Sequence, residues 1–402
     1  MNASTMISAI RNSTHLGVRI RAVAPATPVA NPINVALLVD TSGSMEGDRI
    51  AAVKRTLHAA RALFLPVDTM TMVVFSDGAR VVADHLALDA AGLEEFYTAV
   101  DAIHADGGTN LSEGIEKLII LRRDKPYDAV LLLTDGMINR GIVTNSGLQS
   151  MIRSLGSVAI TALGYGADHN RILLRDLAVQ SHGSYVYVDD ESVLPLTMGD
   201  LIGGLRAEVL KDAIVSVPSG WECCELGGGR DASYKVGNIV PDRDYWVVFK
   251  KRFVAADVEA APIALSGCAG ELTRVPFSDC LELQEQVLRC AVAEAVVAAS
   301  DKMERGQPIG PEVAALNAEF DVLSEAMLAR PLVVRMRAQL AEILAVRADM
   351  PPLPSCLARM SSGGAVLSTQ RGRTGPSDPT AFTSPCQRIA SQQVAEAYST
   401  AI

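Results

Sequence analysis

The first half of the chain alternates between wholly apolar runs and amphipathic stretches. Residues 35–39 (VALLV) and 129–133 (AVLLL) carry no polar side chain. Both runs are too short for a buried helix, so they indicate central strands of a parallel sheet that is covered on both faces. Residues 50–64 place apolar side chains at helical spacing, which predicts an amphipathic helix soon after the first strand. The alternation continues to residue 208.

This pattern predicts an α/β domain over residues 34–208. We expect a doubly wound, mostly parallel six-stranded sheet of Rossmann-like form, with one hairpin at Ser76-Asp77-Gly78 interrupting the parallel order. In open sheets of this kind, ligands bind in the crevice at the carboxyl ends of the central strands. The residues that follow the two apolar runs are therefore the first candidates for a binding site.

The periodicity changes after the α/β domain. Residues 209–280 hold short strand-like runs separated by glycine- and proline-containing breaks, which predict a small antiparallel sheet or sandwich. Residues 281–349 have helical periodicity and predict a helical segment. Residues 350–402 are rich in Pro, Ser, Gly and Thr, so we expect a mobile tail with a short helix near its end.

The N-terminal segment, residues 1–33, contains one predicted strand. Residues 17–23 (GVRIRAV) alternate apolar and polar side chains, as half-buried strands do. Residues 1–16 are polar, and we expect them to be mobile. The position of the strand in the sequence allows it to pair with the sheet predicted for residues 209–280.

Composition narrows the class of protein. The chain has 402 residues, of which 49% are apolar and 20% are charged, a balance typical of globular proteins. Asp and Glu outnumber Lys and Arg by 46 to 36, which gives a net charge of −10. A protein that binds the nucleic-acid backbone needs a basic face, so we expect no nucleic-acid partner.

The cysteines and the N-terminus bear on the compartment. The seven cysteines show neither CxxC spacing nor a zinc-binding framework, so we expect reduced, mostly buried thiols. For the adjacent Cys223 and Cys224 we favour a core position over a redox pair. The N-terminus lacks a signal-peptide pattern, and no apolar window reaches the roughly 18 residues that a membrane span needs. We therefore expect no membrane span and a cytoplasmic location.

Three polar loops are predicted at one edge of the sheet. Asp40-Thr41-Ser42-Gly43-Ser44 follows the first apolar run, residues 106–110 (DGGTN) precede a helix, and Asp135-Gly136 follows the second run. Facing carboxylates in a crevice repel each other unless a positive charge lies between them. The hydroxyl groups of the first two loops add hard oxygen ligands, which suit Mg²⁺, Mn²⁺ or Ca²⁺ better than zinc or copper.

These residues resemble a known motif. Asp40, Ser42 and Ser44 (D-x-S-x-S), with Thr109 and with Asp135 before a glycine, resemble the metal-ion-dependent adhesion site of von Willebrand factor A (VWA) domains. All five motif residues are present in the family's order and spacing. The resemblance covers residues 34–208.

The resemblance implies a specific site. Ser42, Ser44 and Thr109 would give hydroxyl oxygens to Mg²⁺, or alternatively to Mn²⁺ or Ca²⁺, with Thr109 bound directly only in an open state. Asp40 and Asp135 would act chiefly through bridging waters. Because few anionic oxygens touch the metal directly, it would keep one position open for a Glu or Asp of a partner protein.

We therefore expect a divalent-cation-dependent protein–protein interaction module and not an enzyme. His104 and Arg140, which lie near the second and third loops in the sequence, are candidates for the partner-binding rim. We expect the site to lie at the surface, so that replacement of Asp40 or Ser42 by Ala would remove metal binding and leave the fold largely intact.

Two alternative functions stay open. The chain could be an accessory subunit of an enzyme complex, since VWA domains occur beside chelatase-type motor subunits and in RING-type ubiquitin ligases. It could also be a structural component that assembles through its C-terminal tail. The order of N-terminal strand, VWA domain, β-rich segment and helices further resembles inter-alpha-inhibitor heavy chains and VWA–intein-like proteins, a likeness of layout alone.

Overall fold

The computed structural model divides the chain into two compact units. The residues that it describes are 5–23, 31–135, 138–166, 169–188, 193–226, 228, 231–252, 263–266, 271–272, 280–309, 311–345, 390 and 392–397. We call residues 29–207 with 372–402 the α/β unit, and residues 1–28 with 208–371 the β/helical unit. None of the helices in the described ranges has the length and apolar character needed to cross a membrane.

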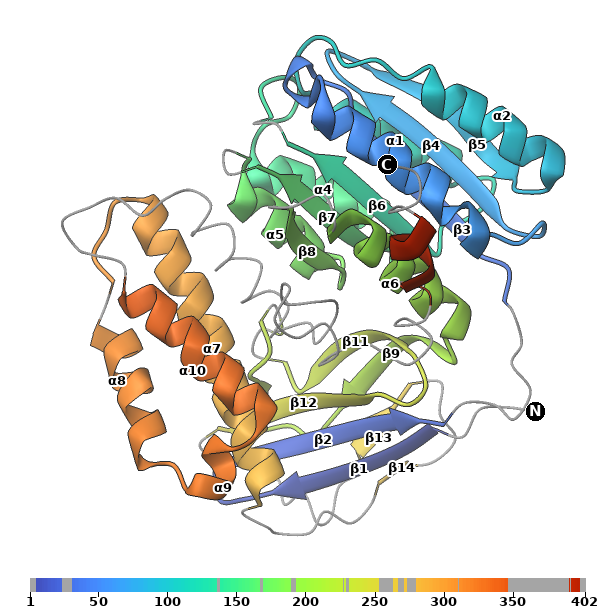
Figure 1. Ribbon diagram of the computed structural model, residues 1–402. Coiled ribbons are helices and arrows are strands. Elements are labelled where there is room, and N and C mark those ends of the chain that lie inside the picture. The colour runs from blue at the N-terminus through green and yellow to red at the C-terminus, as the bar shows by residue number, and fades with distance from the viewer. Residues whose placement is uncertain are drawn as a thin grey trace. The chain divides into compact units, whose positions relative to one another are not determined.

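The α/β unit is built on a six-stranded sheet with the strand order β5-β4-β3-β6-β7-β8 (Figure 1). The strands are β3 (Asn34–Asp40), β4 (Thr69–Phe75), β5 (Ala79–Ala87), β6 (Ala129–Thr134), β7 (Ala159–Tyr165) and β8 (Ser184–Val188). Neighbouring strands are parallel except β4 and β5, which form the predicted hairpin. The predicted doubly wound, mostly parallel fold is confirmed.

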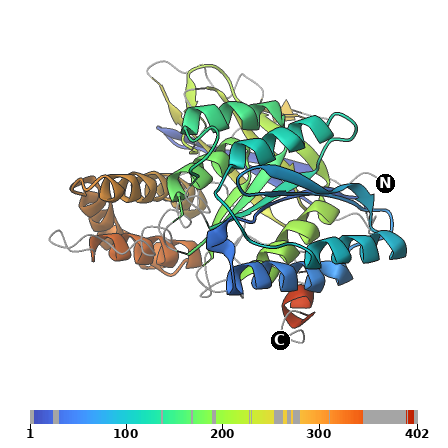
Figure 2. The ribbon, with the colours of Figure 1, turned by 90° about the horizontal axis from the view of Figure 1, so that it is seen from above.

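Helices cover both faces of this sheet (Figure 2). They are α1 (Asp48–Ala59), α2 (Ala90–Asp101), α3 (Leu111–Leu121), α4 (Asn145–Ser154), α5 (Arg171–Gln180) and α6 (Val193–Ala207). Helices α1, α2 and α6 lie on one face, and α3, α4 and α5 on the other. The chain leaves β3 through α1 and leaves β6 through α4, on opposite faces. The carboxyl ends of β3 and β6 therefore border the crevice where such sheets bind ligands.

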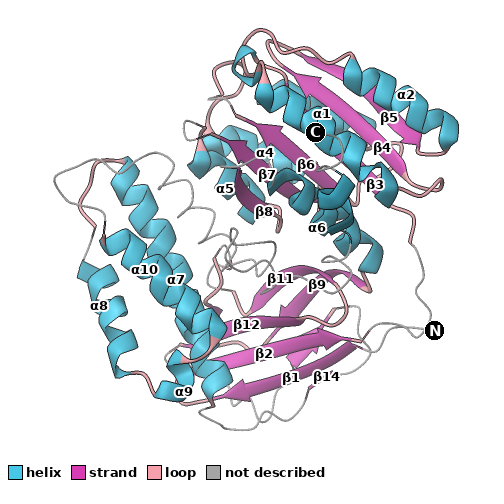
Figure 3. Ribbon diagram, viewed as in Figure 1, coloured by secondary structure: helices cyan, strands magenta, loops and turns pink. Residues whose placement is uncertain are grey.

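The β/helical unit contains two four-stranded antiparallel sheets (Figure 3), which confirm the predicted antiparallel β region. One has the order β1-β2-β12-β10 and the other β11-β9-β13-β14. The strands are β1 (Thr5–Arg11), β2 (His15–Ala22), β9 (Leu210–Ser216), β10 (Trp221–Cys223), β11 (Ser233–Ile239), β12 (Asp244–Lys251), β13 (Ile263–Leu265) and β14 (Glu271–Leu272). The helices of this unit are α7 (Leu281–Glu304), α8 (Pro311–Glu319), α9 (Glu325–Leu328) and α10 (Pro331–Leu344).

The N-terminal segment is more ordered than we expected. The predicted strand does pair with the β region, since β2 lies antiparallel to β12. The expectation that residues 1–16 are mobile is wrong for residues 5–16, because Thr5–Arg11 forms β1 and pairs along its whole length with β2. Residues 1–4 lie outside the described residues. The side chain of Asn12 holds the turn between them, accepting the N–H groups of Thr14 at 3.0 Å and His15 at 2.7 Å.

An ion pair is buried between α7 and the turn after β10. Arg289 donates from Nη1 to Oε2 of Glu225 at 2.9 Å and from Nη2 to Oε1 at 2.5 Å, and both side chains are fully buried. Gln286 accepts the Nε–H of the same guanidinium at 2.7 Å. Removal of one partner from such a pair would leave an uncompensated buried charge. The pair therefore fixes the position of α7 against this part of the β region.

Three cysteine thiols lie around this ion pair. Cys223 and Cys290 are buried, Cys224 is half-buried, and the thiol of Cys290 contacts Glu225 at 3.5 Å. Burial is the main cause that raises the pKa of Cys224 to about 11, and the carboxylate of Glu225 is the second. The same two causes raise the pKa of Cys223. Thiols of this kind stay protonated at neutral pH, which favours the predicted core position over a reactive pair.

Residues 392–397 are docked on the α/β unit. Residues 350–389 of the predicted mobile tail lie outside the described residues, but residues 392–397 form a helical turn. Val394 is fully buried and Ala390 is 7% exposed, and both belong to the hydrophobic core that contains residues of α1 and α6. The expectation of mobility is therefore wrong for residues 392–397, because their apolar side completes the core of the α/β unit.

We expect Val394→Ala to destabilise the α/β unit. The change removes two buried methyl groups, which costs about 2 kcal/mol and corresponds to a melting temperature lower by about 4–8 °C. Gln393→Ala, an exposed position on the same turn, is the control and should melt like the wild type. Differential scanning calorimetry distinguishes the two, and equal melting temperatures for both variants would show that Val394 contributes nothing to the core.

We expect Cys224 to react slowly with iodoacetamide in the native protein. With its pKa raised to about 11, the thiolate fraction at pH 8 is roughly a hundredfold below that of the unfolded chain, and the rate should rise about tenfold per pH unit up to pH 10. Peptide-resolved mass spectrometry gives the rate at this residue, with the urea-unfolded protein as control. Alkylation at the unfolded rate would contradict the burial of this thiol.

Candidate metal centre

The register of the central strands brings two acids to the same edge of the sheet. β3 and β6 pair in parallel with Val39 opposite Leu133, so Asp40 lies opposite Thr134, and Asp135 follows one residue later. The hydroxyl of Thr134 donates a 2.5 Å hydrogen bond to Oδ2 of Asp40. The side chains of both acids are buried. The two carboxylates therefore end neighbouring strands, as the apolar runs predict.

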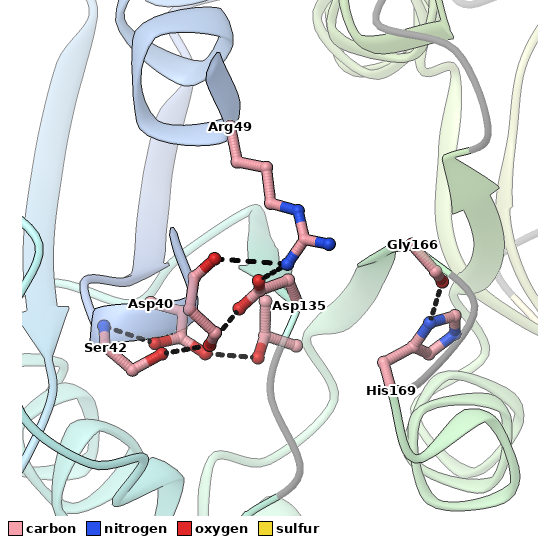
Figure 4. A network of polar contacts seen from close by, with 8 residues as sticks. Asp40, Ser42, Arg49, Asp135, Gly166 and His169 are labelled. Carbon is pink, nitrogen blue, oxygen red and sulfur yellow. Dashed lines mark hydrogen bonds and ion pairs between the residues drawn. The ribbon is translucent and has the colours of Figure 1, made fainter. Parts of the chain in front are cut away.

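Hydrogen bonds link the hydroxyls of the first loop to these carboxylates (Figure 4). Oδ1 of Asp40 accepts the backbone N–H of Ser42 at 2.8 Å. The hydroxyl oxygens of Ser42 and Ser44 lie 3.1 Å apart. The hydroxyl of Ser44 then donates to Oδ1 of Asp135 at 2.8 Å. Four of the five predicted ligands thus form one connected network.

The loop that carries Thr109 is held beside the first loop through the backbone. The N–H of Gly43 donates to the carbonyl of Gly107 at 3.0 Å, and the N–H of Thr109 donates to Oδ1 of Asn139 at 3.0 Å. Gly107 has a φ of +77°, a conformation that glycine adopts without strain. Thr109 is buried. The loop of Thr109 therefore lies at the site. That the Thr109 hydroxyl is a metal ligand stays a prediction.

An arginine that the sequence analysis did not single out joins the network. Arg49, near the start of α1, donates from Nη1 to the carbonyl of Ser44 at 3.1 Å and forms an ion pair with Oδ2 of Asp135. The arginine side chain is 43% exposed, whereas that of Asp135 is fully buried. Both oxygens of Asp135 are therefore engaged, one by a hydroxyl and one by a guanidinium.

A glycine after β7 allows the arginine to adopt this position. Gly166 has a φ of +68°, and a Cβ there would lie 2.9 Å from Nη2 of Arg49. The carbonyl of Gly166 accepts the Nδ1–H of His169 at 2.7 Å, and Nε2 of the same ring lies 2.5 Å from the hydroxyl of Tyr185. His169 is only 3% exposed, so its ring is held in the interior beside this glycine.

The two predicted rim residues lie near the network. His104 is exposed and lines a cavity of about 360 Å³ together with Thr41 and Arg80. Arg140 follows the third loop, and its Nε pairs with Oδ1 of Asp77 at 2.7 Å, both side chains being 57% exposed. An exposed pair of this kind is weak and can rearrange. The role of both residues at a partner surface stays a prediction.

The donor set has the chemistry of a hard divalent cation site. It consists of carboxylate and hydroxyl oxygens that converge from separate loops, which suits Mg²⁺, Mn²⁺ or Ca²⁺. Within the described ranges, no group of three or more His, Cys, Asp or Glu side chains is arranged to hold a metal ion. A cation at this place would therefore depend on the serine hydroxyls as well as on the two acids.

The fold and the site together define a doubly wound α/β domain. Its candidate cation site lies at the carboxyl ends of β3 and β6, where the chain leaves the sheet toward opposite faces. Residues 33–187 match the family model of the von Willebrand factor type A domain. The chain therefore contains a VWA domain, as its sequence motif predicts.

Two relatives of known name match less than half of the chain. The inter-alpha-trypsin inhibitor heavy chain H3 of Rattus norvegicus is 30% identical over 179 residues, which are 41% of this chain and 20% of that protein. The corresponding heavy chain of Mus musculus gives the same identity and coverage. The chain thus spans about a fifth of the length of these curated relatives.

Solved structures share the fold over most of the chain. A von Willebrand factor type A protein from Catenulispora acidiphila superposes with a TM-score of 0.68 at 17% identity, covering 92% of this chain and 97% of that one. The ArnB paralog VWA2 from Sulfolobus acidocaldarius gives 0.56 at 14% identity, with 91% and 98% coverage. At these identities the likeness shows a common fold that extends beyond the VWA domain.

One expectation about the site changes with its geometry. We expected replacement of Asp40 to leave the fold largely intact because the site would lie at the surface. Asp40 is instead fully buried, and its two oxygens accept the N–H of Ser42 and the hydroxyl of Thr134. It therefore has a structural role of its own.

We expect Asp40→Ala to destabilise the VWA domain in the absence of metal. The change removes the acceptor of two hydrogen bonds from buried donors, at about 1–3 kcal/mol for each, so we expect a loss of about 2–6 kcal/mol. Asp40→Asn keeps an oxygen acceptor and should lose less, and Ser44→Ala, at an exposed position, should lose least. Denaturant unfolding in EDTA measures all three, and wild-type stability of Asp40→Ala would refute the structural role.

Proposed function

We propose that the VWA domain binds a divalent cation, Mg²⁺ or alternatively Mn²⁺ or Ca²⁺, and through it an acidic residue of a partner protein. The connected network of Asp40, Ser42, Ser44 and Asp135 at the ends of two neighbouring strands is the observation that supports this most strongly. The VWA family match is consistent with a protein–protein interaction module.

The residues of the network would have two different roles at the metal. Ser42 and Ser44 would offer hydroxyl oxygens directly, joined by Thr109, whose loop lies beside theirs. Asp40 and Asp135 already accept hydrogen bonds from the loop and would hold the site through bridging waters. The bound cation would supply an electrophilic position for a partner's carboxylate.

The partner side of the proposal follows from charge. A metal held mainly by neutral hydroxyls keeps a net positive charge, so it would favour a Glu or Asp side chain over a neutral ligand. His104 and Arg140 would border the bound acid and favour an acidic segment. We propose a binding module and not an enzyme, and the cytoplasmic location stays a prediction.

Calorimetric titration with Mn²⁺ or Mg²⁺ tests the site. We expect Ser42→Ala and Ser44→Ala each to weaken binding by at least about tenfold, since each removes a hydroxyl ligand. Ser150→Ala, an exposed serine on α4, is the matched control and should bind like the wild type. Unchanged affinity in both site variants would exclude this network as the metal site.

Partner dependence is tested by a pull-down carried out once with Mg²⁺ and once with EDTA. Capture that depends on the metal and that Ser44→Ala abolishes would support the interaction. Capture that persists in EDTA would favour an assembly that does not use the metal.

A further inference from the structure

The candidate metal centre contains a cation of its own. Arg49 donates from Nη1 to the carbonyl of Ser44 and pairs with Oδ2 of Asp135, so its positive charge lies against the acid at one end of the network (Figure 4). The carboxylate of Asp135 is fully buried and the Arg49 side chain is 43% exposed, so solvent screens the pair only in part. This guanidinium is therefore a counter-charge for Asp135.

We infer that Arg49 is a built-in competitor of the divalent cation and sets how tightly the site binds it. The inference rests on the metal-binding function proposed above and adds its regulation. The two charges would share one carboxylate: Arg49 holds Oδ2, and the hydroxyl of Ser44 links Oδ1 to Ser42. A cation that binds the two serine hydroxyls would come close to the guanidinium and be repelled by it.

Linkage gives the sign of the effect. Arg49 stabilises the metal-free site through its ion pair, and it destabilises the metal-loaded site through repulsion of like charges. A side chain that favours the free state over the bound state must lower the affinity for the ligand. Removal of the charge should therefore tighten metal binding, unlike removal of a residue that helps to hold the metal.

If Arg49 supports metal binding, the predicted change in affinity has the opposite sign. Arg49 could orient the carboxylate of Asp135 so that its other oxygen meets a metal-bound water, in which case the arginine would support metal binding. Loss of the side chain would then weaken the affinity. The direction of the change separates the two readings.

The experiment is a calorimetric titration of Mn²⁺ into the full chain at fixed ionic strength. We expect Arg49→Ala and Arg49→Gln, which lose the charge, to bind Mn²⁺ about tenfold more tightly than the wild type. Arg49→Lys keeps the charge and should stay within about twofold of the wild type. Should Arg49→Ala fold poorly, Arg49→Gln decides alone, since its amide can still donate to Ser44.

Arg61→Ala is the control for net charge. It removes a positive charge from the exposed 3₁₀ turn that follows α1, where Arg61 is 54% exposed and pairs with Glu94. This turn lies about 18 Å along the helix from Arg49, so we expect no more than a twofold change in affinity.

The outcomes separate this inference from the function that it rests on. Unchanged or weaker Mn²⁺ binding by Arg49→Ala and Arg49→Gln, with normal binding by the wild type, overturns the competitor role and leaves the metal site standing. If neither the wild type nor any Arg49 variant binds Mn²⁺, the proposed function fails and the inference fails with it. Tighter binding by both uncharged variants, with Arg49→Lys unchanged, supports it.

Discussion

Two acids end adjacent parallel strands, and the polar groups around them are arranged to compensate their charge. Such carboxylates are costly to bury unless hydrogen bonds and opposite charge compensate them. Asp40 has a backbone N–H and a hydroxyl as donors, and Asp135 has a hydroxyl and a guanidinium. Their closeness follows from the parallel register of β3 and β6. The positions of the loops follow from this constraint.

The two acids have different surroundings and therefore different roles. Asp40 accepts a backbone N–H from its own loop and a hydroxyl from β6, which hold the path of the chain toward Ser44. Asp135 receives a full positive charge from α1. An incoming cation would therefore change the surroundings of Asp135 more than those of Asp40. The response of the site to ligands would be concentrated at the start of α1.

The sequence predicts the parts of this structure that depend on local pattern. The run VALLV shows a buried strand because helices cover both faces of the sheet, and D-x-S-x-S lies within five residues of one loop. Arg49 could not be found in this way, because its contact with Asp135 joins positions 86 residues apart. Thr5–Arg11 was missed because its side chains are mostly half-buried, and its order comes from pairing with β2. Val394 lies in a single helical turn, whose order comes from docking.

The pairing of β2 with β12 constrains the order in which the chain folds. Arg19 and Asp244, which bond across these strands, are separated by 225 residues. During synthesis from the N-terminus, β1 and β2 exist as a two-stranded hairpin, which is marginally stable alone. The strands of the VWA sheet emerge in between and can pair before β12 appears. β1 and β2 are thus made before the strands of the VWA sheet but completed only after them, and in the interval β2 has an open edge.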